Sequence, residues 1–85
     1  MINEEKKKEL EAATFKRLIS HLQKNTDLQN IDLMNLAGFC RNCLSKWMVE
    51  EAEKMNITLD YEKVRADIYG MDYSVWKKKY QKPIE

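Results

Sequence analysis

Residues 31–55 read IDLMNLAGFCRNCLSKWMVEEAEKM, and this stretch decides the fold. Its apolar residues recur at helical spacing on two adjoining stripes: Leu33, Leu36, Cys40, Cys43 and Trp47 on the first, and Met34, Ala37, Leu44, Met48, Ala52 and Met55 on the second. Because the remaining polar strip is narrow, the pattern predicts one unbroken central helix that packs against neighbours on several sides. Gly38 lies inside it and costs up to about 1 kcal/mol relative to Ala, so we expect another backbone to approach closely there.

The flanking segments predict three further helices and no strand. Apolar spacing favours a helix over about residues 3–24, after which Asn25 is suited to the left-handed conformation that ends helices. Residues 61–69 favour another helix, stopped by Gly70, and Asp72 is suited to cap the last one.

Composition agrees with a small helical protein. Gly and Pro total only three of 85 residues, so a many-turned β fold is disfavoured. The sequence therefore predicts an all-α, compact four-helix single domain over residues 1–85, of which residues 1–12 form the charged start of the first helix. A chain this short buries only about 60% of the surface that it exposes when unfolded. Support from a partner, a metal or a second copy is consistent with so small a core.

Charge and hydropathy limit the classes of partner. Fifteen Lys and Arg against fourteen Asp and Glu leave a net charge of +1, which argues against a large basic field for nucleic acid or anionic membranes. The longest apolar run, Leu36–Cys40, has five residues, whereas a membrane span needs about 20. The N-terminus lacks the pattern of a secretory signal, so a cytoplasmic location with reduced thiols is expected.

The residues of the central block resemble a known family. Residues 29–47, reading QNIDLMNLAGFCRNCLSKW, together with Tyr69-Gly70-Met71, Tyr73, Trp76-Lys77 and Tyr80-Gln81, are similar to the bacterial family catalogued as domain of unknown function 1244. Phe15, Arg17, Leu18, His21 and Leu22 fit its first helix, so the likeness covers roughly residues 13–81. Asp72 stands where that family is expected to have Pro, and either residue can start a helix. The resemblance implies a short, all-helical, cytoplasmic protein without an established activity.

Cys40 and Cys43 form a CxxC pair that faces one way if the central helix is continuous. With His21 they make a candidate metal site, for which zinc is suited by its preference for thiolate and imidazole. A fourth ligand would come from Asp32, from Asp67 or from a second chain across a two-fold axis.

Two alternatives use the same cysteines. They can be small buried apolar residues, as cysteine often is. They can also serve thiol redox exchange, although a reactive CxxC usually begins at a helix N-terminus and Cys40 is predicted to lie inside a helix. His21 has no nucleophile or carboxylate fixed beside it by spacing, so catalysis is disfavoured.

A polar cluster runs through the same segment: Asn30, Asp32, Asn35, Arg41 and Asn42, with Ser45 beside it. Asn30 and Asp32 are expected to cap the central helix. Arg41 and Asn42 can alternatively hold a carboxylate or a phosphate.

Three functions stay open. The first is a non-enzymatic binding or interaction protein that works through residues 30–47, as a homodimer or with a protein partner, with or without a metal held through the CxxC and His21. The second is a small redox factor or enzyme that uses Cys40 and Cys43. The third is a DNA-binding helical hairpin around Gly70, in which Lys77–Lys79 contact the phosphates and Trp76 or Tyr80 stacks on a base. An ordinary helical hairpin is favoured over this third function, and in it Trp76 and Tyr80 are expected to be core anchors.

Overall fold

The computed structural model describes residues 2–83 and contains five α-helices and no strand in that range. They are α1 (Glu4–Lys24), α2 (Asn30–Ala37), α3 (Arg41–Lys54), α4 (Tyr61–Tyr69) and α5 (Tyr73–Tyr80). The all-α class is thus confirmed, whereas the number of helices was predicted as four. Within the described range, no helix combines the length and the apolar character needed to cross a bilayer.

The additional helix arises because the predicted central helix is broken at Gly38. This glycine has a φ of 75°, and its N–H bonds to the carbonyl of Met34, which is a left-handed helix C-terminus. Cys40 follows in an extended conformation, and its carbonyl accepts the first hydrogen bond of α3, from Leu44 N–H. The prediction of an unbroken helix over 31–55 was therefore wrong. Nothing lies within 4 Å of a Cβ built on Gly38, so its conformation, and not the close backbone that we expected, accounts for the glycine.

The break also changes burial, because the two shorter helices point in different directions. Leu36 is 86% exposed and Trp47 is 49% exposed, although both belong to the predicted core stripe. The apolar stripes of residues 31–55 are thus divided between a buried part and a surface part.

Most other helix ends agree with the sequence. Asn3 caps α1 by accepting from Lys6 N–H at 2.8 Å, Asp60 caps α4, and Asp72 occupies the N-cap position of α5. Gly70 ends α4 with a φ of 78°. Asn25 does not adopt the left-handed conformation that we expected, since its φ is −112°.

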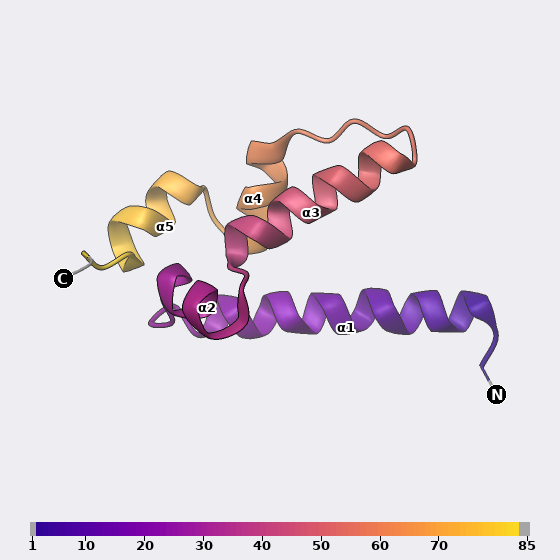
Figure 1. The fold of residues 1–85 in the computed structure, drawn as a ribbon, viewed down its shortest axis with the longest axis horizontal. Helices are drawn as coiled ribbons and strands as arrows, with labels where there is room; N and C mark the ends of the chain where they lie inside the picture. The colour runs from indigo at the N-terminus through magenta and orange to yellow at the C-terminus, as the bar shows by residue number, and fades with distance from the viewer. Residues whose placement is uncertain (1, 84–85) are drawn as a thin grey trace.

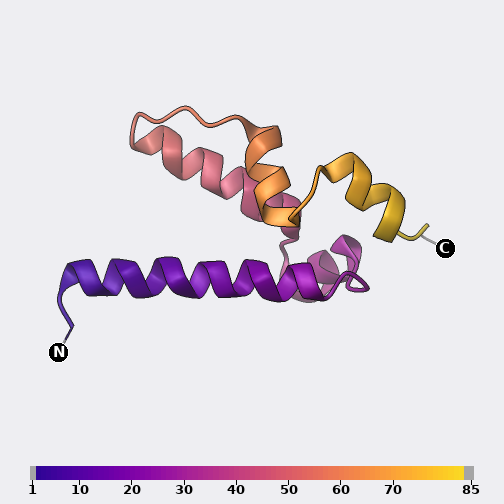
Figure 2. The same cartoon turned by 180° about the vertical axis from the view of Figure 1, so that it is seen from behind.

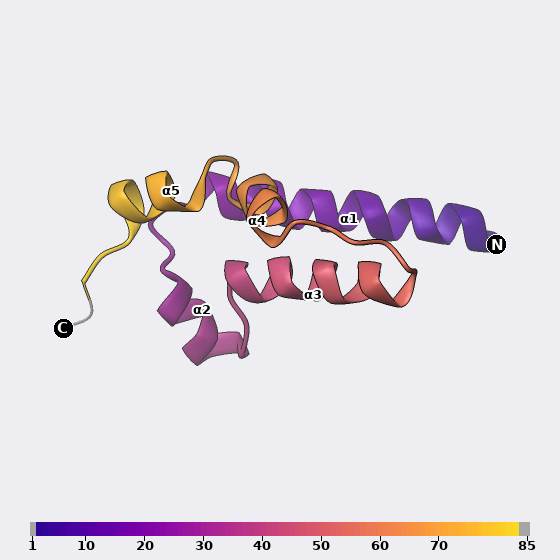
Figure 3. The ribbon, with the colours of Figure 1, turned by 90° about the horizontal axis from the view of Figure 1, so that it is seen from above.

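The buried residues come from all five helices. α4 packs against α3, contacts α5 and crosses α1 near the end of α1 (Figures 1 and 2). One buried cluster contains Leu22, Leu33, Cys40 and Leu44, and the other buried apolar residues are Ala52, Val64, Ile68, Tyr69 and Trp76. Figure 3 shows α2 and α3 displaced to one side of α1, and the start of α1 extends past the other helices.

Replacing either of the two left-handed glycines by Ala is expected to lower stability, and the loss is expected to be larger at Gly70 than at Gly38. Gly38→Ala is expected to lower the free energy of unfolding by about 1 kcal/mol, because only the left-handed backbone penalty applies. Gly70→Ala is expected to cost about 2 to 3 kcal/mol, because its Cβ would also lie 3.0 Å from Cδ of Gln23 and disturb the bonds from that amide to the carbonyls at the end of α4. Urea unfolding of both variants measures the order, and equal losses would contradict this account.

Candidate functional site

Arg41 is the buried centre of the region that the sequence singled out. It is the first residue of α3, and only 1% of its surface is exposed. Its guanidinium donates to the carbonyl of Leu28 at 2.7 Å, to Oδ1 of Asn30 at 3.0 Å and to the carbonyls of Asn25 and Leu22 at 3.1 and 3.4 Å. These acceptors belong to the end of α1, the connection that follows it and the start of α2. Arg41 therefore joins three segments of backbone.

The electrostatics of this position explain how a charge without a carboxylate partner is held. The carbonyls at the end of α1 form the negative end of its dipole, which favours a cation. The guanidinium also lies 4.9 Å from the ring of Trp76. Burial lowers the pKa of Arg41, while the nearby Tyr69 and Cys40 oppose this shift. Because its donors already bind four oxygen atoms of this chain, the guanidinium serves the fold, and the structure gives no support to the alternative of an anion held by Arg41.

Tyr69 completes the polar network, and sequence reasoning did not include it. Its hydroxyl accepts from Nδ2 of Asn30 at 3.0 Å and donates to Oδ1 of Asn42 at 2.7 Å. Burial raises the pKa of this tyrosine well above its ordinary value of 10, with the bond from Asn30 acting in the opposite direction. The sequence contained one signal for this role, because Tyr69 directly precedes Gly70, the glycine that ends the helix. A tyrosine at such a position can be buried, and a buried hydroxyl needs hydrogen-bond partners.

The other members of the predicted polar cluster lie elsewhere. Asp32 and Asn35 are exposed on α2, and the N-cap position of α2 is occupied by Gln29 without a side-chain cap. The prediction that Asn30 and Asp32 cap this helix was therefore wrong, because the amide of Asn30 is used by Arg41 and Tyr69.

Gln29 has a different task, which the sequence did not indicate. Its amide donates to the carbonyl of Tyr80 at 3.0 Å and accepts from the N–H of Lys82 at 2.9 Å. It thereby fixes the segment after α5 to the start of α2.

The two cysteines lie together despite the broken helix. Their sulfurs are 3.8 Å apart, Cys40 is buried at the N-cap of α3, and Cys43 is partly exposed one turn later. The thiol of Cys43 also lies 3.8 Å from the sulfur of Met34 on α2. Sequence reasoning missed Met34 as a neighbour, because residues 34 and 43 of one continuous helix would be about 13 Å apart along its axis.

The structure does not bring His21 to the cysteines as part of a three-ligand group. His21 is exposed near the end of α1, and residues 2–83 contain no cluster of three or more His, Cys, Asp or Glu side chains placed to hold one metal ion. Asp32 and Asp67, the expected additional ligands, are exposed on α2 and α4.

The position of Cys40 bears on the redox alternative. We expected Cys40 inside a helix, but it occupies the N-cap position of α3, and a helix N-terminus is where a reactive CxxC usually begins. One objection to thiol exchange is thus removed, while the burial of Cys40 limits its access to a reaction partner. The redox function stays a prediction.

The hairpin of α4 and α5 is held by aromatic packing. Trp76 is fully buried and lies 4.9 Å from the ring of Tyr69 in an edge-to-face arrangement, so the expectation that it is a core anchor is confirmed. It is therefore not available to stack on a base. Lys77–Lys79 are exposed on α5, and DNA binding through them stays a prediction.

A protein-family model matches most of the chain. The family model described as "Protein of unknown function (DUF1244)" matches residues 28–85. The first-helix likeness that we noted in residues 13–27 lies outside this range. No match was found among the curated proteins.

Replacing Arg41 tests its role in the fold. Arg41→Lys is expected to lower the free energy of unfolding by about 2 to 4 kcal/mol, because an ammonium cannot reproduce the planar fork and leaves buried carbonyls without donors. Arg17→Lys is the matched control, since Arg17 is exposed on α1, and it is expected to change stability by less than about 0.5 kcal/mol. Urea unfolding measures both, and a loss at Arg41 no larger than at Arg17 would refute the assignment.

Tyr69→Phe tests the hydroxyl network and its pH dependence. At neutral pH the variant is expected to lose about 1 to 2 kcal/mol, because the amides of Asn30 and Asn42 each lose a partner. The pKa of Tyr69 is raised in the folded state, so its contribution is complete below the unfolded value of about 10 and declines as pH rises beyond it.

Unfolding at pH 8 and at about pH 11 measures this pH dependence. The difference between wild type and Tyr69→Phe should shrink at the higher pH. Tyr73→Phe, which removes only a long 3.4 Å bond to Gln81, is the control. A difference that is independent of pH would contradict the assignment.

Proposed function

The chain belongs to the DUF1244 family, and we propose that it is a small non-enzymatic binding protein that works as a homodimer, with the apolar surface between α1 and α3 as its interface. The observation that carries the proposal is an unusually large exposed surface that includes three hollows lined by one residue, Phe15.

The surface area of the chain is too large for an isolated domain of its mass. It exposes 6820 Å², whereas a folded monomer of 10.2 kDa exposes about 5,300 Å². The radius of gyration is 14.5 Å, against about 12 Å for a typical domain of this length. The excess of about 1,500 Å² exceeds the roughly 800 Å² per partner that a standard interface buries. One further copy supplies an interface of sufficient size.

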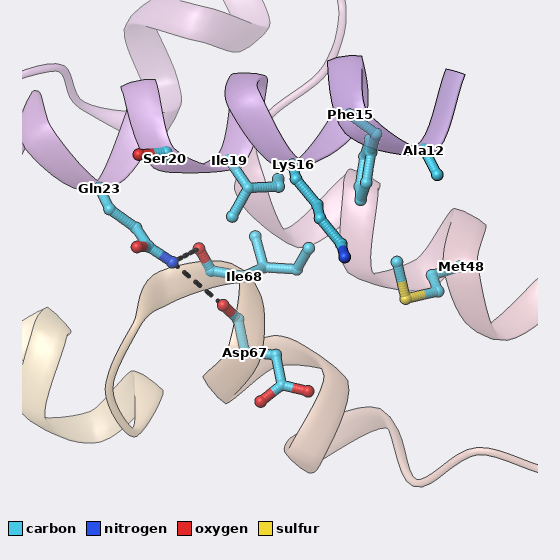
Figure 4. Close-up of a pocket in the computed structure, with 9 residues that line it drawn as sticks. All are labelled: Ala12, Phe15, Lys16, Ile19, Ser20, Gln23, Met48, Asp67 and Ile68. Atoms are coloured by element: carbon cyan, nitrogen blue, oxygen red, sulfur yellow. Dashed lines mark hydrogen bonds between the residues drawn. The ribbon is translucent and has the colours of Figure 1, made fainter. Parts of the chain in front are cut away.

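Apolar hollows mark where this interface lies. Phe15 lines one of about 440 Å³ with Ile19, Met48 and Ile68, and its ring and the Met48 side chain border the same space (Figure 4). It also lines a second hollow on the α3 side, with Trp47, and a third along α1. These hollows adjoin one another because they share Phe15, and charged residues such as Lys16 and Glu51 lie at their edges.

The first half of α1 provides the matching part of a second copy. Residues 4–14 are exposed, and the start of α1 extends past the other helices (Figure 1). Leu10, which is 53% exposed, and Leu18 line the hollow along α1 with Phe15. A helical segment without packing is marginal in water. In a two-fold dimer the α1 stripe of each chain can cover the hollows of the other, so one kind of contact satisfies both surfaces.

The proposal extends the function expected from the sequence. Trp47, the last residue of the predicted working segment, borders the hollow on the α3 side. A binding role also fits the small core, since association adds burial that 85 residues cannot supply alone.

Measurement of the molar mass tests the proposal. Light scattering after size exclusion is expected to give twice 10.2 kDa for the wild type at micromolar concentration. The double variant Leu10→Glu/Met48→Glu is expected to give the monomer mass with an unchanged helical circular dichroism spectrum, because both residues are partly exposed and each carboxylate would be desolvated in the interface.

Met55→Glu is the control, because Met55 is 69% exposed at the end of α3 and lines none of these hollows. It should remain dimeric. A monomeric wild type would overturn the proposed interface. So would a double variant Leu10→Glu/Met48→Glu that stays dimeric like the Met55→Glu control.

A further inference from the structure

We propose that the sulfur atoms of Met34, Cys40 and Cys43 form a binding site for monovalent copper, Cu(I). The site uses a different surface from the proposed dimer interface, and the inference does not depend on that interface.

The spacing of two sulfur pairs suits one small ion. Cys43 lies 3.8 Å from Cys40 and 3.8 Å from Met34, so it is the middle member of the group. Two sulfurs that bind one ion at about 2.3 Å are about 3.8 to 4.0 Å apart at tetrahedral or trigonal angles. The sulfur of Cys43 is therefore at the distance from each of the other two that a shared ion requires.

The chemistry of these ligands selects the metal. Thiolates and a thioether are soft ligands of the kind that Cu(I) takes, whereas zinc sites are completed by imidazole or carboxylate and not by methionine. Residues 2–83 bring no group of three His, Cys, Asp or Glu side chains together, so a closed zinc site lacks ligands here. The proposed copper ligands Met34, Cys40 and Cys43 thus replace the zinc ligands Cys40, Cys43 and His21 that the sequence predicted.

Positive groups lie beside the sulfurs. Cys40 is the N-cap residue of α3, so the positive end of that helix dipole is next to the sulfurs. The positive charge of Arg41 interacts with Cys40. Cu(I) with two thiolates and a neutral thioether has a net charge of −1, which these positive groups offset.

The ion also has access to the site. Met34 is 41% exposed and Cys43 is partly exposed, whereas Cys40 is buried beneath them. An ion can therefore reach the first two sulfurs from solvent without unfolding of α2 or α3. The buried third sulfur then completes the coordination on the side away from water.

Competition with a chromophoric Cu(I) chelator under anaerobic conditions, with a reductant that contains no thiol, tests the site. The wild type is expected to bind one Cu(I) per chain. Met34→Leu is expected to weaken Cu(I) binding by about 10-fold or more, because even indirect support of a metal ligand is worth this much. Met55→Leu makes the same change at a distant exposed methionine and should leave the affinity unchanged.

A spectroscopic measurement complements the variants. X-ray absorption of the Cu(I) form is expected to show three sulfur neighbours, and selenomethionine labelling should replace one of them by selenium in the wild type but not in Met34→Leu. Less than about 0.1 copper per chain, equal affinity of wild type and Met34→Leu, or copper without a selenium neighbour would each overturn the site.

Discussion

The structure depends on how one buried cation is satisfied. Arg41 begins α3, and its guanidinium binds the backbone where α1 ends and where the following connection leads into α2. It also lies against Trp76 of α5, which packs on Tyr69 at the end of α4. A buried guanidinium is costly unless its donors are paired, and carbonyls at a helix C-terminus supply both hydrogen bonds and a negative potential. A domain with a small core thereby obtains a defined arrangement of three helix ends around one charge, at the end of α1 and at the starts of α2 and α3.

The break at Gly38 determines what the central segment can do. An unbroken helix would have kept Met34 far from the CxxC along its axis. The left-handed turn instead reverses the chain, so that Cys43 of α3 lies 3.8 Å from Met34 of α2 and Cys40 becomes the cap of α3. A single conformational feature of the backbone thus creates the sulfur group and gives it a helix N-terminus.

A chain this short has a limited core, and the two ends of the molecule differ in what adds to its stability. At one end, polar bonds of Gln29 and Arg41 join segments that apolar burial alone would hold weakly. At the other, the start of α1 and the hollows that Phe15 of α1 lines together with residues of α3 are left for a partner. The proposed dimer and the proposed copper site would each add stability to the folded state by binding to it.

The sequence by itself determined the helical class, the family and most helix ends, because a residue such as Gly70 or Asp72 ends or begins a helix within a few residues of its own position. It also indicated Trp76 as a core residue. It did not determine the break at Gly38, since a glycine tolerated inside a helix and a glycine that ends one look alike in an apolar pattern. The partners of Arg41 and the approach of Met34 to Cys43 were decided only by the tertiary structure. These contacts depend on which helix ends and helix faces meet in the folded chain. Residues that are distant along the sequence determine this arrangement together.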